Sequence, residues 1–174
     1  MQIHLAYLNG YRPQWADRMA DGVARSMPYP VSACDLTVDV APSYASDRRQ
    51  YHATLILAAL LRELPRPDDK LIGVTNVDLF IPVLTFVFGQ SQLGGSGAVM
   101  STHRLHPDFY GLPPNEALVV DRAVKETVHE LGHALGLVHC QDYRCVMSVS
   151  TYVEDVDLKT AQYCTQCRSQ IDGG

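Results

Sequence analysis

Hydrophobic residues in the first half of the chain recur at two spacings, one typical of strands and one typical of helices. Ile3, Leu5 and Tyr7 alternate with polar or small residues, which predicts a strand that ends in a turn at Asn9-Gly10. Farther on, apolar residues at near-helical spacing predict a long helix that ends at the proline-rich segment 64–67. In the order strand, helix, strand, helix, strand, strand, the expected elements span residues 3–7, 13–26, 31–40, 44–64, 71–77 and 84–88.

The second half of the chain is organised around one long amphipathic helix. Pro113-Pro114-Asn115 marks its start. Its apolar stripe, at steps of three and four residues, consists of Val120, Val124, Val128, Leu131 and Leu135. Before this helix, the glycine-rich segment 89–97 leads into residues 98–101, which we expect to form an edge strand, with a loop as the alternative. After it, an irregular segment precedes a short helix near 157–169.

Strands that alternate with helices predict an α/β fold. With 174 residues, the chain is long enough for one sizeable hydrophobic core and too short for two ordinary domains. Hydrophobic residues make up 47% of the chain and charged residues 19%, which is the balance of a folded protein rather than a disordered one. We therefore expect a single domain over residues 1–174.

The charge of the chain argues against a nucleic-acid partner and indicates no other kind of partner. The formal net charge is -5 and no run of Lys and Arg occurs, so we expect no nucleic-acid partner. No segment is long and apolar enough to span a bilayer, and the N-terminus lacks the features of a secretion signal. We expect a cytoplasmic, monomeric protein whose thiols stay reduced.

The long helix carries a pattern of histidines that is typical of a metal site. His129 and His133 are one helical turn apart, so both imidazoles project from the same face and can reach one ion. Gly136 can adopt the left-handed conformation that turns the chain back, which brings His139 close enough to be the third ligand. Three neutral histidines on Zn²⁺ leave one coordination position for water.

Glu130 lies beside a ligand but points elsewhere on the helix, so it is the candidate general base. A zinc ion lowers the pKa of its water from about 15.7 towards about 7, and Glu130 can take the proton. The alternative for a bare HExxH pattern is a helix whose polar side chains merely face solvent. The extended pattern HExxHxxGxxH is far more specific, because the glycine and the third histidine must also fall at the required positions.

The cysteines suggest a second metal site. Cys34 lies in a predicted strand and is interpreted as a buried small hydrophobe. The other cysteines are Cys140, Cys145, Cys164 and Cys167. Four thiolates, two of them in a CxxC pair, can hold a structural zinc ion; two disulfides and a redox-active CxxC are the alternatives. Because Cys140 follows His139 directly, we expect the two metal sites to depend on each other.

These motifs together resemble the archaemetzincin family of zinc metallopeptidases. HExxHxxGxxH is followed by Cys140, Cys145 and Met147, and then by the pair Cys164 and Cys167. The resemblance covers residues 124–167 and, more loosely, 71–105. It implies a compact metzincin-like fold in which a mixed twisted sheet packs on an active-site helix, with Met147 in a Met-turn beneath the histidines. A small C-terminal part, about 140–174, would be held together by the cysteine zinc.

The resemblance also implies a function and two zinc ions per chain, one catalytic and one structural. We expect a zinc-dependent peptidase, either an aminopeptidase or a small-peptide hydrolase, that acts on peptide substrates. An edge strand within residues 94–101 would bind an extended peptide by main-chain hydrogen bonds, through Gly95, Gly97 and Ala98. The alternatives are a catalytically weak zinc-binding or peptide-binding module on the same scaffold, and a metal-stabilised interaction protein. The intact Glu130 favours the enzyme, because binding alone needs no base.

Overall fold

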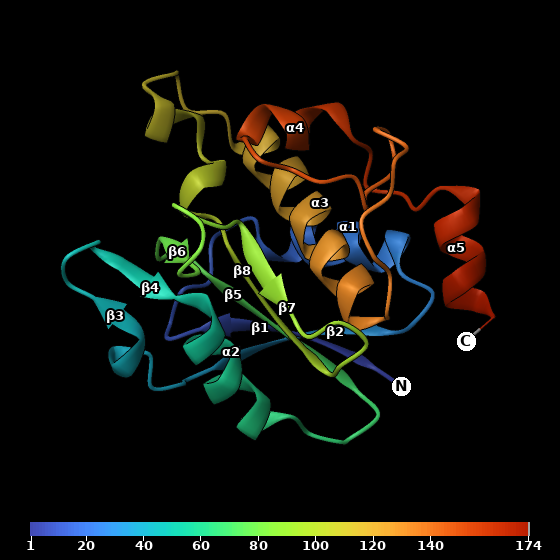
Figure 1. Cartoon of the computed structure of the whole chain (residues 1–174), viewed down its shortest axis with the longest axis horizontal. Helices are drawn as coiled ribbons and strands as arrows, with labels where there is room; N and C mark the ends of the chain where they lie inside the picture. Colours follow the sequence, from blue (N-terminus) through green and yellow to red (C-terminus); the bar gives the residue numbers. More distant parts are fainter. Residues whose placement is uncertain (174) are drawn as a thin grey trace.

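A mixed five-stranded sheet forms the centre of the molecule in the computed structural model, which describes residues 1–173 (Figure 1). In spatial order its strands are β2 (Val31–Leu36), β1 (Ile3–Leu8), β5 (Lys70–Thr75), β8 (Gly97–Ser101) and β7 (Gly89–Ser91). The pairings among β2, β1, β5 and β8 are parallel, and β7 pairs antiparallel with β8. The α/β class and the mixed sheet expected from the sequence are therefore confirmed.

The remaining elements surround this sheet. The α-helices are α1 (Ala16–Ser26), α2 (Ala53–Leu60), α3 (Glu116–Ala134), α4 (Val153–Leu158) and α5 (Thr165–Asp172). A second, three-stranded sheet consists of β3 (Tyr44–Ala45), β4 (Gln50–His52) and β6 (Leu79–Phe80). Short 3₁₀ helices are η1 (Ala41–Ser43), η2 (Leu61–Glu63), η3 (His103–Leu105) and η4 (Pro107–Tyr110).

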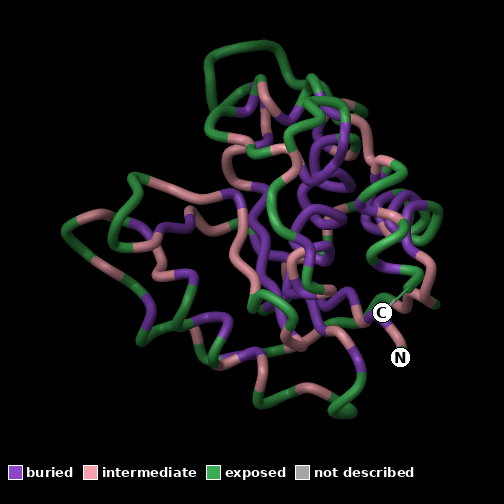
Figure 2. Tube along the Cα trace, turned by 45° about the vertical axis from the view of Figure 1, so that its right-hand side comes forward, coloured by how far each residue is buried: buried purple, intermediate pink, exposed green. Residues whose placement is uncertain are grey.

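Both faces of the central sheet are covered. Alternate side chains of a strand point to opposite faces, so a single strand contributes to two cores. On β1, Ile3, Leu5 and Tyr7 join one hydrophobic core with residues of α1 and α3, whereas Ala6 and Leu8 join a second core with residues of α2. In Figure 2 the buried parts of the trace run through the sheet and along α3. The helix that carries the predicted metal ligands is thus packed against the centre of the molecule.

The predicted helix at 44–64 is only partly correct. Its first half forms β3, a turn with Arg49 at φ 55°, and β4, and α2 begins only at Ala53. The reason is local, since the residues from 46 to 50 are all polar or charged and the continuous apolar run starts only at Leu55. The predicted strand at 84–88 is wrong. That segment is a loop whose carbonyls, at Leu84 and Thr85, accept hydrogen bonds from the Arg48 side chain instead of from a neighbouring strand.

Residues 98–101 form a strand, as expected, but it is not an edge strand. β8 lies inside the sheet between β5 and β7, and all of its residues are buried. Gly94, at φ 64°, lies in the turn that folds β7 back against β8, so β7 occupies the edge instead. Gly97 and Ala98 are therefore enclosed by neighbouring strands, and Gly95 lies in the turn. None of these three residues lines the cleft described below.

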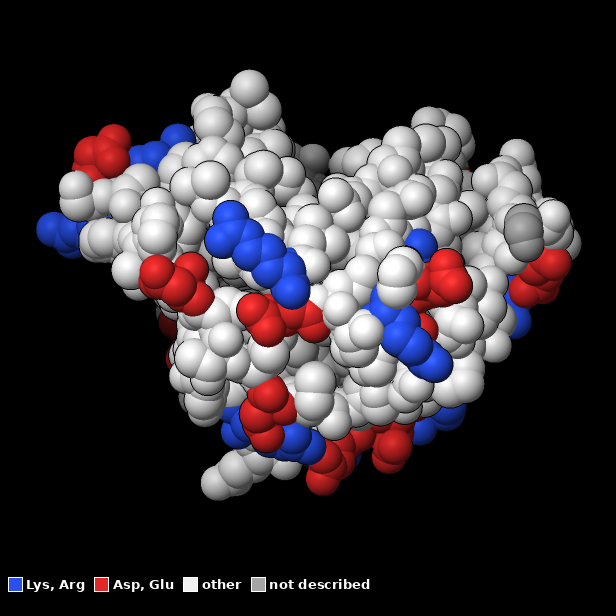
Figure 3. Space-filling model, turned by 90° about the horizontal axis from the view of Figure 1, so that it is seen from below, with Lys and Arg blue, Asp and Glu red and all other residues white. Residues whose placement is uncertain are grey.

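Two smaller expectations also need correction. The helix predicted at 157–169 is two helices, α4 and α5, separated by an irregular segment, and Cys164 is the residue that precedes α5. Cys34 is exposed, because β2 forms the other edge of the central sheet. Within residues 1–173, no helix combines the length and the apolar character needed to cross a membrane. On the face seen in Figure 3, basic and acidic side chains are interspersed.

Candidate active site and metal centres

Three of the candidate active-site residues, His129, Glu130 and His133, lie on α3. Contacts at its start and along its length hold this helix in place. The side chain of Asn115 accepts a hydrogen bond from the Leu118 amide at 3.1 Å and so caps the first turn. A Cβ atom on Gly22 of α1 would lie 2.5 Å from Val124, so the close packing of α1 on α3 depends on glycine there. α3 also packs along β7 and β8, which places its far end, with the histidines, beside the edge of the sheet.

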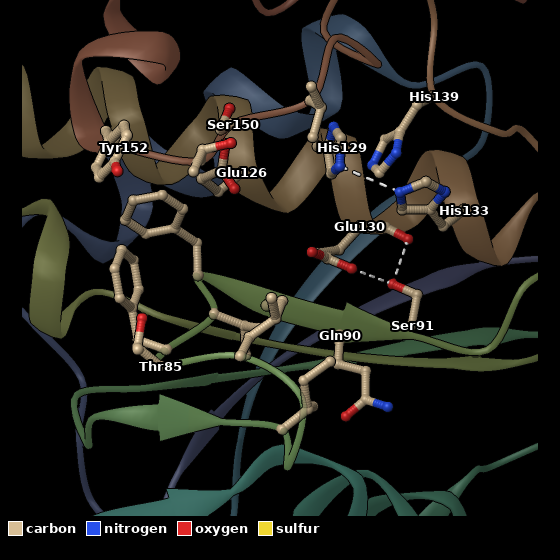
Figure 4. Close-up of a pocket in the computed structure, with 18 residues that line it drawn as sticks. Thr85, Gln90, Ser91, Glu126, His129, Glu130, His133, His139, Ser150 and Tyr152 are labelled. Carbon is tan, nitrogen blue, oxygen red and sulfur yellow. Dashed lines mark hydrogen bonds between the residues drawn. The ribbon is translucent and has the colours of Figure 1, made fainter.

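The three histidines converge as the sequence predicts (Figure 4). Nδ1 of His129 lies 2.8 Å from the Val146 carbonyl, and Nδ1 of His133 lies 2.8 Å from the Leu137 carbonyl. Since a carbonyl only accepts, each Nδ1 carries the proton and each Nε2 keeps a free lone pair. The two Nε2 atoms lie 3.1 Å apart, and the candidate ligand atoms of all three rings, including His139, lie within 4.8 Å of one another.

This donor set fits a metal ion. Two imidazole lone pairs directed at each other repel unless a cation lies between them, and zinc accepts neutral imidazole nitrogens. Burial lowers the pKa of His129 and of His133, and the nearby Lys159 ammonium lowers both further. Burial also lowers the pKa of His139. All three rings are thus held in the neutral state that metal binding requires.

The end of α3 brings His139 to the other two histidines. Gly136 has φ 96°, and its amide donates to the His133 carbonyl at 2.9 Å. The Leu137 amide then donates to the Gly132 carbonyl at 2.9 Å, which closes the helix end. The predicted break at Gly136 is confirmed, and the reversal of the chain there places His139 beside His129 and His133, with ring centroids 5.3 and 4.8 Å away respectively.

Met147 is fully buried, and its side chain packs against Gly132, the residue before His133. A Cβ atom on Gly132 would lie 2.3 Å from its sulfur, so the methionine can pack here only because the residue before His133 is glycine. The same segment contacts both predicted metal sites. The Val146 carbonyl accepts from His129, and the Met147 carbonyl accepts from the Cys140 amide at 2.9 Å.

Replacing Gly132 by alanine is expected to lower the free energy of unfolding by about 1–3 kcal/mol, because the new methyl group overlaps Met147. Urea denaturation of the zinc-loaded protein measures this. The control is a double-mutant cycle with Met147→Ala, which removes the overlapping side chain. If Gly132→Ala costs as much in the Met147→Ala background as in the wild type, the overlap is not the cause.

Glu130 is buried beneath β7. Burial raises its pKa to about 8, and a hydrogen bond donated by the Ser91 hydroxyl opposes this rise. The Ser91 oxygen also lies 2.8 Å from the backbone carbonyl of Glu130, which ties β7 to α3. A Cβ atom on Gly89 would lie 2.6 Å from the Glu130 carboxylate and 2.7 Å from the Val99 carbonyl, so β7 can approach this closely only with glycine there.

A cleft with a volume of about 500 Å³ opens beside the histidines and Glu130. Its walls are the edge strand β7, the loop 81–88 and the segment 149–152 that follows the Met147 turn. In Figure 4 His133 and His139 lie at one end and Tyr152 lies at the other, with Glu126 and Ser150 between Tyr152 and His129. Reasoning from the sequence missed Gly89, Ser91 and Glu126. Residues 88–95 contributed to the family resemblance, and that resemblance was the one sequence signal for Gly89 and Ser91.

The four C-terminal cysteines form the second cluster. Their sulfur atoms lie within 4.8 Å of one another, and those of Cys140 and Cys164 are 3.8 Å apart, too far for a disulfide. Backbone amides point at the sulfurs, from Asp142 to Cys140 at 3.4 Å and from Cys164 to Cys145 at 3.3 Å. The pKa of Cys164 is lowered, chiefly by the hydrogen bond from the Cys167 amide. Four convergent thiols with amide donors are a donor set that fits a zinc ion.

Comparison with known proteins agrees with these two clusters. The profile of peptidase family M54 matches residues 33–173. An archaemetzincin of Methanocaldococcus jannaschii is 47% identical over 129 residues, which cover 74% of this chain and 70% of that protein. The chain belongs to the archaemetzincin family. The crystal structure of an archaemetzincin from Archaeoglobus fulgidus, complexed with malonate, superposes with a TM-score of 0.81 at 36% identity over 98% of this chain and 99% of that one.

A third relative bears on the activity of archaemetzincins. A zinc-dependent peptidase from Methanocorpusculum labreanum superposes with a TM-score of 0.86 at 28% identity, over 97% of this chain and 99% of that one. This archaemetzincin is accordingly a zinc metallopeptidase, as the sequence motifs predict. Its two clusters, of histidines and of cysteines, indicate two metal sites.

Proposed function

We propose that this archaemetzincin hydrolyses short peptides at a zinc ion held by His129, His133 and His139, with Glu130 as the general base. One observation carries the proposal. Three unprotonated ring nitrogens converge at the end of a cleft, and the Glu130 carboxylate lies in the same cleft beside them. A structural role for the histidines would need neither the cleft nor the carboxylate.

In this proposal the protein residues have separate tasks. Zinc bound at the histidines would supply Lewis-acid chemistry, which polarises the scissile carbonyl and makes a water more acidic. Glu130 accepts the proton of the attacking water and then donates it to the leaving amine. Ser91 holds the Glu130 carboxylate in place. The carbonyls of Val146 and Leu137 keep the protons of His129 and His133 on Nδ1, away from the ion.

The four cysteines would hold the second zinc ion, which has a structural role. A site with four thiolate ligands is closed, so it offers no position for water or substrate. It would link the segment after His139 to the start of α5, through Cys140 and Cys145 on one side and Cys164 and Cys167 on the other.

The edge strand β7 is the proposed site of main-chain contact with the substrate. In an antiparallel pair, the amide and carbonyl groups of successive residues point alternately towards the partner strand and away from it. The hydrogen bonds from the Ser101 amide to the Phe88 carbonyl and from the Gln92 amide to the Gly97 carbonyl fix which residues point towards β8. The amide and carbonyl groups of Gly89 and Ser91 therefore face away from β8, towards the free edge. An extended peptide can add there as a further strand. β7 has only three residues, which favours a short peptide or a bond near a peptide N-terminus.

Two peptide libraries test this function, one with free N-termini and one that is N-terminally acetylated. The zinc-loaded protein is incubated with each, and mass spectrometry identifies the products. Cleavage of the free library alone would establish an aminopeptidase, and cleavage of both would establish a small-peptide hydrolase without that requirement. The Glu130→Ala variant is the control for contaminating proteases. If neither library is cleaved at high enzyme concentration, the proposed function is wrong and the protein binds peptides without hydrolysing them.

Replacing Ser91 by alanine is expected to move the acidic limb of the pH profile of kcat/KM upwards by about one pH unit. The Ser91 hydroxyl stabilises the charged form of Glu130, so its loss raises the pKa of the base, which must be deprotonated to act. Initial rates between pH 5 and 9 measure the shift. Ser91→Thr, which keeps the hydroxyl, should restore the wild-type limb. A Ser91→Ala profile that is merely lower at every pH would contradict this role.

A further inference from the structure

We propose that the part of the cleft around Glu126 and Ser150, between His129 and Tyr152 (Figure 4), is a side-chain pocket that selects tyrosine in the substrate. This inference rests on the proposed function, because it assigns the side chain that the peptide places there. Both residues line the cleft together with the histidines, Glu126 from α3 and Ser150 from the segment that follows the Met147 turn. In Figure 4 they lie next to each other, away from His133 and His139.

The walls of this pocket are apolar and partly aromatic. Leu84, Phe86, Phe88 and Val149 line the cleft that contains it. The rings of Phe86 and Phe88 meet edge to face, with centroids 5.4 Å apart and an angle of 78° between the planes. The guanidinium of Arg104 lies 4.2 Å from the centroid of the Phe86 ring. A flat aromatic side chain suits such walls, since offset and edge-on ring contacts add to the gain from burial.

The wall formed by the loop 81–88 is held in place before any substrate binds. The Arg48 guanidinium donates at 2.9 Å to each of the carbonyls of Leu84 and Thr85, and the Gln50 amide donates to Thr85 at 3.0 Å. The Val87 amide donates to the Leu79 carbonyl at 3.0 Å. The loop thus needs little further ordering on binding, which favours a selective pocket over an adaptable surface.

The floor of the pocket is polar and incompletely paired. Glu126 is 2% exposed, and its Oε1 atom lies 2.8 Å from the ammonium of the buried Lys159 without accepting an aligned hydrogen bond. The Ser150 hydroxyl is buried and has no hydrogen-bond partner among the described residues. Buried polar atoms are nearly always paired, so the unpaired Ser150 hydroxyl, beside the ion-paired Glu126 carboxylate, indicates that a ligand group binds there.

The charges at the floor decide which group this is. The ammonium of Lys159 already compensates the Glu126 carboxylate, so a lysine or arginine of the substrate would bring an unpaired positive charge into a buried site. A leucine or phenylalanine would cover the carboxylate and the hydroxyl, and would leave the Ser150 hydroxyl unpaired. A neutral group that donates one hydrogen bond and accepts another matches the carboxylate and the hydroxyl. The phenol of tyrosine does both, at the end of an aromatic ring that suits the walls.

Succinyl hydroxamates that differ only in one side chain provide the test, because they bind without being hydrolysed. Calorimetry with the zinc-loaded protein compares four side chains: 4-hydroxybenzyl, benzyl, isobutyl and 4-aminobutyl. We expect the 4-hydroxybenzyl compound to bind at least about tenfold more tightly than the benzyl compound, the range of a hydrogen bond to a charged acceptor. The 4-aminobutyl compound should bind most weakly. Equal affinity of the two aromatic compounds, tighter binding of 4-aminobutyl, or no binding of any compound would overturn the proposal.

Two variants connect the preference to the floor. Glu126→Leu combined with Lys159→Met replaces the ion pair by apolar groups without leaving one charge buried, and should abolish the preference for 4-hydroxybenzyl over benzyl. Ser150→Ala leaves the ion pair intact and should reduce the preference several-fold, so the test survives if the double variant does not fold. A preference unchanged in Ser150→Ala and in a folded double variant would overturn the proposal. Hydroxamate selectivity without cleavage of any library would instead refute only the peptidase function.

Discussion

Replacing Glu130 by alanine is expected to lower kcat/KM by about 10²–10⁴-fold, the usual contribution of a general base. The zinc content should stay unchanged, because the Glu130 carboxylate is not part of the group of three histidines. Its side chain is held by Ser91 instead, on the side of β7. Peptide hydrolysis and elemental analysis of the same purified sample measure the two quantities together.

The matched control is His133→Ala, which removes a ligand from the same face of α3. Here the metal is expected to be lost first, and activity with it, because two histidines hold zinc much less well than three. Loss of zinc from a folded Glu130→Ala variant would count against its assignment as the base. An unchanged zinc content in His133→Ala would overturn the role of that histidine as a ligand. The two variants thus separate proton transfer from metal binding.

The parts of the site that could be predicted from the sequence are those set by local spacing. His129 and His133 must lie on one face of any helix that contains them, and the positive φ of Gly136 follows from the glycine. The start of α3 at Asn115 is likewise signalled by a capping residue after two prolines. The spacing of His129 and His133 on one helix face and the turn before His139 depend only on these local features.

The parts that were missed depend on contacts between distant segments. Which strand lies at an edge is decided by pairing, and β8 is an interior strand because the turn at Gly94 folds β7 onto it. The loop 84–88 has the composition of a strand, but side chains from residues 48–50 bind its carbonyls. Lys159 forms an ion pair with Glu126, which is far from it in the sequence, and no hydrophobic periodicity predicts such a pair. Hydrophobic spacing describes one element at a time and carries no information about such partners.

This arrangement also predicts that the two metal sites depend on each other. The chain passes from His139 directly to Cys140, whose amide donates to the Met147 carbonyl at 2.9 Å. The neighbouring Val146 accepts the Nδ1 proton of His129 and donates its own amide to the Gln162 carbonyl at 2.9 Å, close to Cys164. We therefore expect a displacement of the cysteine cluster to reach two of the three histidines, His139 through the chain and His129 through a hydrogen bond.

Cys164→Ser is therefore expected to remove the cysteine-bound zinc and to weaken the histidine site by about 10–100-fold, the usual cost of losing groups that orient metal ligands. Titration of each variant with zinc in the presence of a competing chelator measures both affinities. Cys34→Ser is the matched control, because Cys34 is exposed on β2 and belongs to neither cluster. That variant should bind zinc as the wild type does. Unchanged affinity at the histidines in Cys164→Ser would refute the coupling, and would mean that Val146 and Met147 keep their positions without the cysteine zinc.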